Sequence, residues 1–173
     1  MIKTLSNEFM QKIATEKAWE KLSEDFNWSE TLLEKYQDKV DWKWICRNIH
    51  IQWTIPMIQK FKNRIDWDEF SEQADGEILT EAVIEAFKDK WNWLELSKND
   101  SLELTHELLE KYADSWNWEN IIDRYNNNLF GNKGVDFYEK YKDRIPAAKL
   151  QDSMLWREIV EQRVRQLKAE ITG

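Results

Sequence analysis

The chain has 173 residues, a net charge of -8 and 11 tryptophans, but only four glycines and two prolines. So few helix breakers favour a helical protein, and the 42% apolar share supplies enough side chains for a folded core. The acidic balance argues against direct nucleic-acid binding, which needs a basic stripe to displace counterions from phosphates.

The segment at the start of the chain, MIKTLSNEFMQKIATEK, has no continuous apolar stretch of the kind found in secretory signals. Nowhere do 18 apolar residues run together, so no membrane partner is expected. The single cysteine, Cys46, cannot form an internal disulfide. We therefore expect a cytoplasmic protein.

The first element expected in chain order is an N-terminal capping helix within residues 1–17. Ser6 has the side chain of a helix N-cap. Leu5 before it and Met10 after it have the spacing of a hydrophobic staple. This helix is expected to cover the beginning of the repeats that follow.

Residues 18–145 consist of five tandem units of about 25 residues. Successive repeat tryptophans are 23, 25, 26 and 25 residues apart, and a second aromatic column keeps the same register. The first column contains Trp19, Trp42, Trp67, Trp93 and Trp118, and the second contains Tyr36, Phe61, Phe87, Tyr112 and Tyr141. We expect the repeat tryptophans to be buried in equivalent positions.

Each unit is predicted to form two short helices. Before most repeat tryptophans stands a short polar side chain suited to an N-cap, and three residues after each stands an apolar one. These caps are Asp41, Asp66, Asn92 and Asn117, and the apolar positions are Leu22, Ile45, Phe70, Leu96 and Ile121. The second-helix caps are Ser29, Thr54, Thr80 and Thr105, with Gly134 in the fifth unit as a weaker cap.

Residues 146–173 are predicted to form a degenerate sixth unit and a C-terminal capping helix. Leu150 takes the apolar position of its first helix. A longer helix then carries an apolar stripe of Leu155, Ile159, Val160, Val164, Leu167 and Ile171. Its other face is polar, as a solenoid cap requires, with Arg157, Glu158, Arg163, Arg165 and Lys168.

Two helices in about 25 residues, joined by short loops, predict antiparallel hairpins that stack on their neighbours. We expect an all-α fold. It should be an α-solenoid of about five to six stacked helical hairpins with N- and C-terminal capping helices, forming a single domain over residues 1–173.

The units resemble those of tryptophan-rich tandem helical-repeat proteins of bacteria and large viruses. The resemblance covers residues 18–145 and rests on the DW or NW, LS and LLEKY segments, as in NWLELSKNDSLELTHELLEKYADSW. It implies a repeat scaffold with no assigned chemistry. The fifth unit departs from the pattern, because Ile122 replaces the serine and NNNLFGNKG lengthens a loop.

Catalytic chemistry finds little support in the sequence. His50 and His106 occupy different places in different units, so they are not expected to converge on one metal or substrate. Cys46 stands in the column of Ser23, Ser71 and Ser97, which favours a sheltered structural residue over a reactive thiol. No phosphate loop or nucleophile motif is present. We predict no catalytic residue, no cofactor and no metal site.

Candidate interaction residues lie where the repeat is broken. Trp44 stands where other units have Lys21, Glu69, Glu95 and Asn120, so it is either an exposed anchor for a partner or a ring packed against a neighbouring loop. Leu129 and Phe130, in the inserted loop, either form a recognition tip or fold back over the last hairpin.

These observations favour a noncatalytic protein-protein interaction scaffold with a protein partner, and a basic partner would complement the net charge. The alternative is an inhibitor, either an immunity protein for a toxin or an acidic mimic of nucleic acid. A mimic should align its carboxylates in a strip, whereas segments such as EKYQDK and EKYKDR intersperse them with cations. An enzyme is the third and least supported class.

Overall fold

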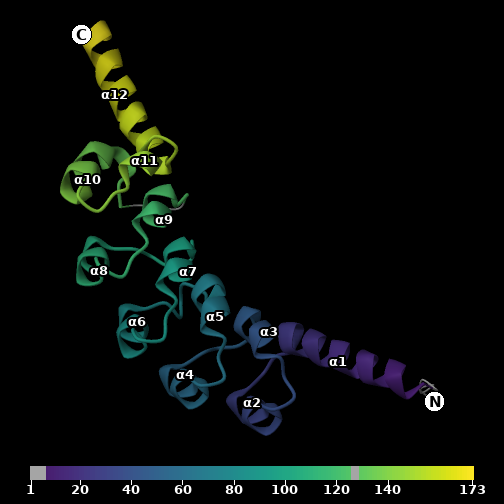
Figure 1. Cartoon of the computed structure of the whole chain (residues 1–173). Coiled ribbons are helices and arrows are strands. Elements are labelled where there is room, and N and C mark those ends of the chain that lie inside the picture. Colours follow the sequence, from purple (N-terminus) through teal and green to yellow (C-terminus); the bar gives the residue numbers. More distant parts are fainter. Residues whose placement is uncertain (1–6, 126–128) are drawn as a thin grey trace. The chain divides into compact units, whose positions relative to one another are not determined.

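The computed structural model describes residues 7–125 and 129–173. Within these ranges the chain forms twelve α-helices and one 3-10 helix, and no strand (Figure 1). The all-α prediction is therefore confirmed. The chain separates into two compact units, Met1–Lys90 and Trp91–Gly173. The single-domain assignment stays a prediction.

In the first unit the helices alternate between two rows (Figure 1). The first helices of successive repeats stack directly, since α3 contacts both α1 and α5. This row consists of α1 (Glu8–Asp25), α3 (Trp42–Arg47) and α5 (Trp67–Gln73). The second helices are α2 (Glu30–Tyr36), α4 (Ile55–Phe61) and α6 (Glu81–Ala86). This is the stacked-hairpin arrangement of an α-solenoid.

The second unit repeats the alternation and ends in a long helix. One row contains α7 (Trp93–Lys98), α9 (Trp118–Asp123) and α11 (Ala147–Leu150), in which α9 contacts both of the others. The second helices are α8 (His106–Lys111) and α10 (Gly134–Tyr141), the latter preceded by the 3-10 helix η1 (Gly131–Lys133). The final helix, α12 (Met154–Thr172), packs on α9, α10 and η1.

The predicted polar caps are confirmed in both units. The Thr105 hydroxyl, for example, accepts the N–H of Leu108 at 3.1 Å, and this bond satisfies a backbone donor that the helix itself leaves free. Equivalent bonds occur at Ser29, Thr54, Thr80, Asp41, Asp66, Asn92 and Asn117. Four residues after each second-helix cap lies a fully buried aliphatic side chain, namely Leu33, Ile58, Ile84 or Leu109.

Two other predicted caps are wrong. Helix α1 begins at Glu8 and is capped by Asn7, whose side chain accepts the N–H of Phe9 at 2.9 Å. Ser6 is therefore not its cap, and Leu5 and Ser6 lie outside the described residues. Gly134 is the first residue inside α10, and the cap position before it is held by Lys133, which makes no side-chain cap hydrogen bond. Helix α1 also runs on through residue 17, so the capping helix and the first repeat helix are continuous.

The two aromatic columns meet inside each hairpin. Each repeat tryptophan lies against the second aromatic residue of its own unit, with ring centroids between 4.9 Å for Trp93–Tyr112 and 5.7 Å for Trp19–Tyr36. The positions are equivalent, but only Trp118 is buried and the others are half-buried. Their indole N–H needs a carbonyl at the rim; that of Trp42, for instance, donates to Gln37 O at 3.0 Å.

A serine column ties successive repeats together. The Ser23 hydroxyl donates to the Trp19 carbonyl at 2.7 Å and accepts the N–H of Asp41, the cap of the next repeat, at 2.9 Å. In the second unit the Ser97 hydroxyl accepts the N–H of Asn117 at 3.0 Å in the same way. We call this arrangement the serine clamp. It satisfies a backbone donor that the cap's own side chain does not reach.

The serine clamp explains two departures from the repeat. In the second repeat the sulfur of Cys46 takes the place of the hydroxyl and faces the backbone N–H of Asp66. In the fifth repeat the position holds a fully buried Ile122, and the next helix is preceded by Pro146, which has no N–H to satisfy. The apolar side chain and the proline therefore belong together.

Helix α12 does not present one apolar stripe as predicted. Leu155 is fully buried, but Val160, Leu167 and Ile171 are exposed. The helix continues beyond the last hairpin, so its outer turns have nothing among the described residues to cover them (Figure 1).

Candidate interaction surface

Two neighbouring grooves lie along the loops of the first unit. The first, of 460 Å³, lies between residues 49–53 and residues 75–78, and we call it the loop groove. The second, of 360 Å³, lies between residues 27–30 and residues 50–57, and we call it the cap groove. Gln52 lines both, so the segment connecting α3 with α4 is their common wall.

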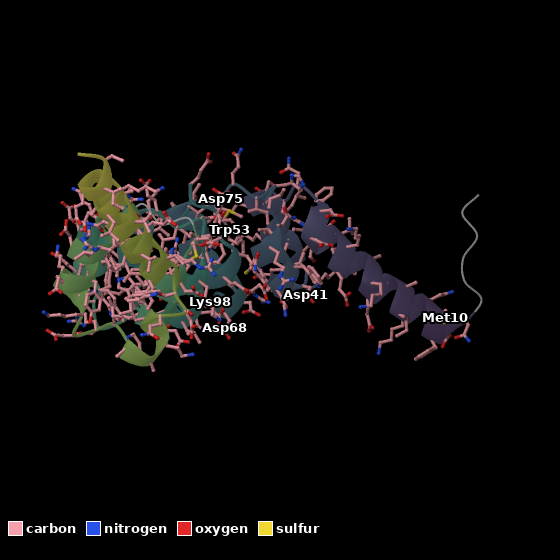
Figure 2. The ribbon with its side chains drawn as sticks, turned by 90° about the horizontal axis from the view of Figure 1, so that it is seen from above. Met10, Asp41, Trp53, Asp68, Asp75 and Lys98 are labelled. Atoms are coloured by element: carbon pink, nitrogen blue, oxygen red, sulfur yellow. The ribbon has the colours of Figure 1, made fainter. Side chains whose placement is uncertain are left out.

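The loop groove combines apolar and acidic side chains. Ile49 at its edge is 88% exposed, while Trp53 is half-buried with its ring 5.1 Å from that of Phe70. Asp75 and Glu77 are exposed on the opposite wall, and Figure 2 shows Asp75 beside Trp53. No lysine or arginine is among the described residues that line this groove. It therefore suits a ligand with an apolar and a cationic group.

A buried asparagine holds the common wall of the two grooves in place. The Asn48 amide donates to the carbonyls of Ser23 at 2.9 Å and Phe26 at 2.8 Å, both in the preceding repeat. Its own carbonyl oxygen accepts the N–H of His50 at 2.8 Å. All three bonds fix the start of the loop, so the grooves are preformed.

The same column carries a different side chain in the fifth repeat. Arg124 is buried, and its guanidinium donates to the carbonyls of Ser97 at 3.3 Å and Leu102 at 2.7 Å. Burial lowers the pKa of Arg124 from its ordinary value. The column six residues after the repeat tryptophan, with Asn48, Asn99 and Arg124, was the sequence signal for these loop anchors.

Trp44 lies on α3, away from the lining of both grooves. The Arg47 guanidinium lies 5.3 Å from its ring centre and also pairs with the buried carboxylate of Glu69. Lys43 approaches the same carboxylate at 3.5 Å. The half-buried ring of Trp44 is thus covered on one face by a cation from its own helix.

Leu129 and Phe130 are both buried in the second unit. The Phe130 ring meets that of Phe137 edge to face, with centroids 5.3 Å apart. The sequence left two alternatives for the inserted loop, a recognition tip or a segment that folds back over the last hairpin. In the structure these two residues fold back. They present no recognition tip in this structure.

The histidines occupy unrelated surroundings. His50 is exposed and lines the cap groove of the first unit. In the second unit the Nδ1 of His106 lies 3.1 Å from the Tyr141 hydroxyl, and the two rings are stacked. In the described part of the chain, no three His, Cys, Asp or Glu side chains are placed to hold a metal ion.

Cys46 is buried, and its burial raises the pKa of the thiol to about 12. We expect this thiol to react with Ellman's reagent at pH 8 only after the protein is unfolded in urea. Because the folded pKa lies above the unfolded one, this group's contribution to stability is complete below pH 9 and is lost as the pH rises toward 12.

The variant Cys46→Ser should retain the clamp and change the free energy of unfolding by less than about 1 kcal/mol. It should also lack the thiol's contribution to the alkaline loss of stability. Rapid labelling of native Cys46 would contradict the buried position.

Comparison with known proteins gives no relative: no protein-family model, no curated protein and no solved structure matches the chain. Among the described helices, none has the length and apolar character needed to cross a membrane.

Proposed function

We propose that the protein is a noncatalytic interaction module that binds a segment of a partner protein carrying apolar and cationic side chains. The loop groove is the proposed site. The observation that carries this proposal is the 88% exposed Ile49 in a groove whose charged lining side chains, Asp75 and Glu77, are both acidic. A groove that combines apolar side chains, here Ile49 and the half-buried Trp53, with a few polar ones is typical of a binding site.

The rigidity of the groove supports the proposal. The hydrogen bonds of Asn48 anchor one wall, and Asp75 accepts the N–H of Glu77 at 2.8 Å on the other. Trp53 is held between them against the buried Phe70. A partner therefore loses little affinity to ordering of the site itself.

The arrangement of charge favours a scaffold over a mimic of nucleic acid. Between α2 and α4 of the first unit, Lys60 Nζ lies 2.9 Å from Glu30 and 2.7 Å from Glu34, and just after these helices Arg64 lies 2.6 Å from Asp38. These cations divide the acidic side chains into paired groups, whereas a mimic needs an unbroken strip of phosphate-like charge. The proposed partner is accordingly a protein segment.

The proposal is tested with three fluorescein-labelled peptides of equal length: alternating lysine and leucine, alternating glutamate and leucine, and alternating lysine and serine. Fluorescence anisotropy at low and high salt gives their affinities. Only the lysine-leucine peptide should bind, because it alone supplies both groups. The double variant Asp75→Lys, Glu77→Lys should weaken it by at least about tenfold, since two attractions become repulsions.

The matched control is Asp143→Lys, an exposed charge reversal in the second unit. It should leave the affinity within about twofold, since Asp143 does not line the groove. A second variant, Ile49→Ser, removes the apolar contact without changing the charge of the groove. Equal binding of all three peptides, or binding that none of the groove variants weakens, would refute the site.

A further inference from the structure

Helix α12 has two distinct faces. One face is seated on the last hairpin: Leu155 is fully buried, and the Gln162 side chain accepts the N–H of Val135, in α10, at 3.2 Å. Ile159 approaches so closely that a Cβ at Gly134 would lie 3.1 Å from its Cγ1. This face accounts for the contacts of α12 with α10 and η1.

The other face carries a second apolar seam. Val160 is 43% exposed, Leu167 38% and Ile171 82%, and Val164 between them is half-buried. Successive members are four, three and four residues apart, the spacing of a coiled-coil core. Val160 and Leu167 then occupy d positions, and Val164 and Ile171 occupy a positions. We call these four residues the α12 seam.

The charges that flank the α12 seam select an orientation for a helix paired with it. The flanking e positions are Glu161 and Lys168, and the g positions are Arg163 and Glu170. In a parallel pair of identical helices, g meets e, which would set Arg163 against Lys168. In an antiparallel pair, e meets e and g meets g, so that Glu161 meets Lys168 and Arg163 meets Glu170.

We propose that α12 pairs with the α12 of a second copy of this chain, antiparallel, through the α12 seam. All four flanking charges of each helix then lie opposite charges of the other sign, and the two-fold symmetry of the dimer makes each pair occur twice. The Arg163 guanidinium already lies 3.3 Å from Glu170 within the same helix, which places both groups along one edge of the seam. The inference does not depend on the proposed function, since the loop groove belongs to the other unit.

The interface is small. Residues 160–171 span about 16 Å of helix, so the contact falls in the class of weak, concentration-dependent associations. Sedimentation velocity from about 10 μM to about 1 mM should accordingly show a shift from monomer to dimer. A monomer throughout that range would overturn the proposal.

Charge variants test the orientation. Arg163→Glu sets two pairs of like charge against each other in the dimer and should weaken it by about tenfold. Adding Glu170→Arg restores opposite charges and should return the affinity to nearly that of the original chain. The altered residues are exposed, and circular dichroism should show unchanged helix content. A failure of the second substitution to restore dimerisation would count against antiparallel pairing.

Disulfide trapping tests the register in a Cys46→Ser background. In the proposed dimer residue 160 lies opposite residue 171 of the partner, whereas two copies of residue 160 are about 16 Å apart, too far for a disulfide. An equimolar mixture of Val160→Cys and Ile171→Cys chains should therefore form only the mixed disulfide on mild oxidation.

A disulfide between identical variants would show parallel pairing and overturn the proposal. Helix α1 offers a different apolar surface, with Phe9 and Met10 exposed. If Phe9→Asp abolished the dimer, α1 would be part of the interface, and the proposed pairing of α12 with α12 would be overturned.

Discussion

Replacing Phe70 with alanine is expected to lower the free energy of unfolding of the first unit by about 3–5 kcal/mol. Phe70 is fully buried in α5, and its ring lies 5.1 Å from that of Trp53 and 5.8 Å from that of Trp67. The substitution removes the aromatic contacts of both tryptophans and leaves a cavity that rigid helices cannot close. Urea denaturation followed by circular dichroism measures the loss.

The matched control for Phe70 is Phe9→Ala in α1. Phe9 is 67% exposed, so the same chemical change there should alter the free energy of unfolding by less than about 0.5 kcal/mol. The experiment should be done in dilute solution, where association is negligible. Equal effects of the two substitutions would mean that the core does not run through α5.

Replacing Ile122 with serine should cost about 3 kcal/mol, although serine is the residue that other repeats carry there. Ile122 is fully buried, so the change empties part of the core around α9. In the other repeats the hydroxyl accepts an N–H from the next cap, but Pro146 has none to give. The hydroxyl introduced at position 122 is then a buried acceptor that lacks this N–H partner.

A second substitution should recover part of that loss. Pro146→Asn restores the backbone N–H, so the double variant should be about 1 kcal/mol more stable than the sum of the two single effects. A double-mutant cycle by urea denaturation measures this coupling. Strictly additive effects would show that the clamp does not extend to the fifth repeat.

The sequence was sufficient for features that depend on chemistry within one repeat. A threonine such as Thr54 caps a helix through a hydroxyl and an N–H three residues away, so its role follows from local spacing. The aromatic columns were equally readable, because a hairpin brings fixed positions together. The half-burial of Trp42 could not be predicted from the sequence, because it depends on which carbonyl accepts the indole N–H. In the structure this acceptor is Gln37 O, at 3.0 Å.

The candidate site was largely missed, for a physical reason. The loop groove is made by loops from neighbouring repeats, and its most informative residue, Ile49, is an isoleucine that composition alone would place in the core. Trp44 stands at a break in the repeat, and its role as an interaction residue stays a prediction. Its covering by Arg47 depends on the ion pair with Glu69 in the next repeat, which no single unit reveals.

The ends of the chain diverge from the pattern because stacking stops there. The sequence shows apolar residues along α12 but does not distinguish a residue that faces α10, such as Ile159, from one that faces outward, such as Ile171. Both occur at helical spacing, and only the position of the last hairpin separates them. Leu129 and Phe130 are the opposite case, since both are buried and the last hairpin offers Phe130 an aromatic neighbour, Phe137.

The serine clamp also bears on how such a chain changes length. Each clamped unit supplies an acceptor at its first helix and a donor at its cap, as Ser23 and Asp41 illustrate. Duplicating or deleting one whole unit therefore leaves each of these backbone donors with an acceptor, whereas a cut inside a unit leaves one donor without its acceptor. Ile122 has no acceptor and Pro146 has no N–H donor, so the serine clamp is not continued after the fifth repeat. Growth by gene duplication is thus permitted upstream of this pair in steps of one complete hairpin.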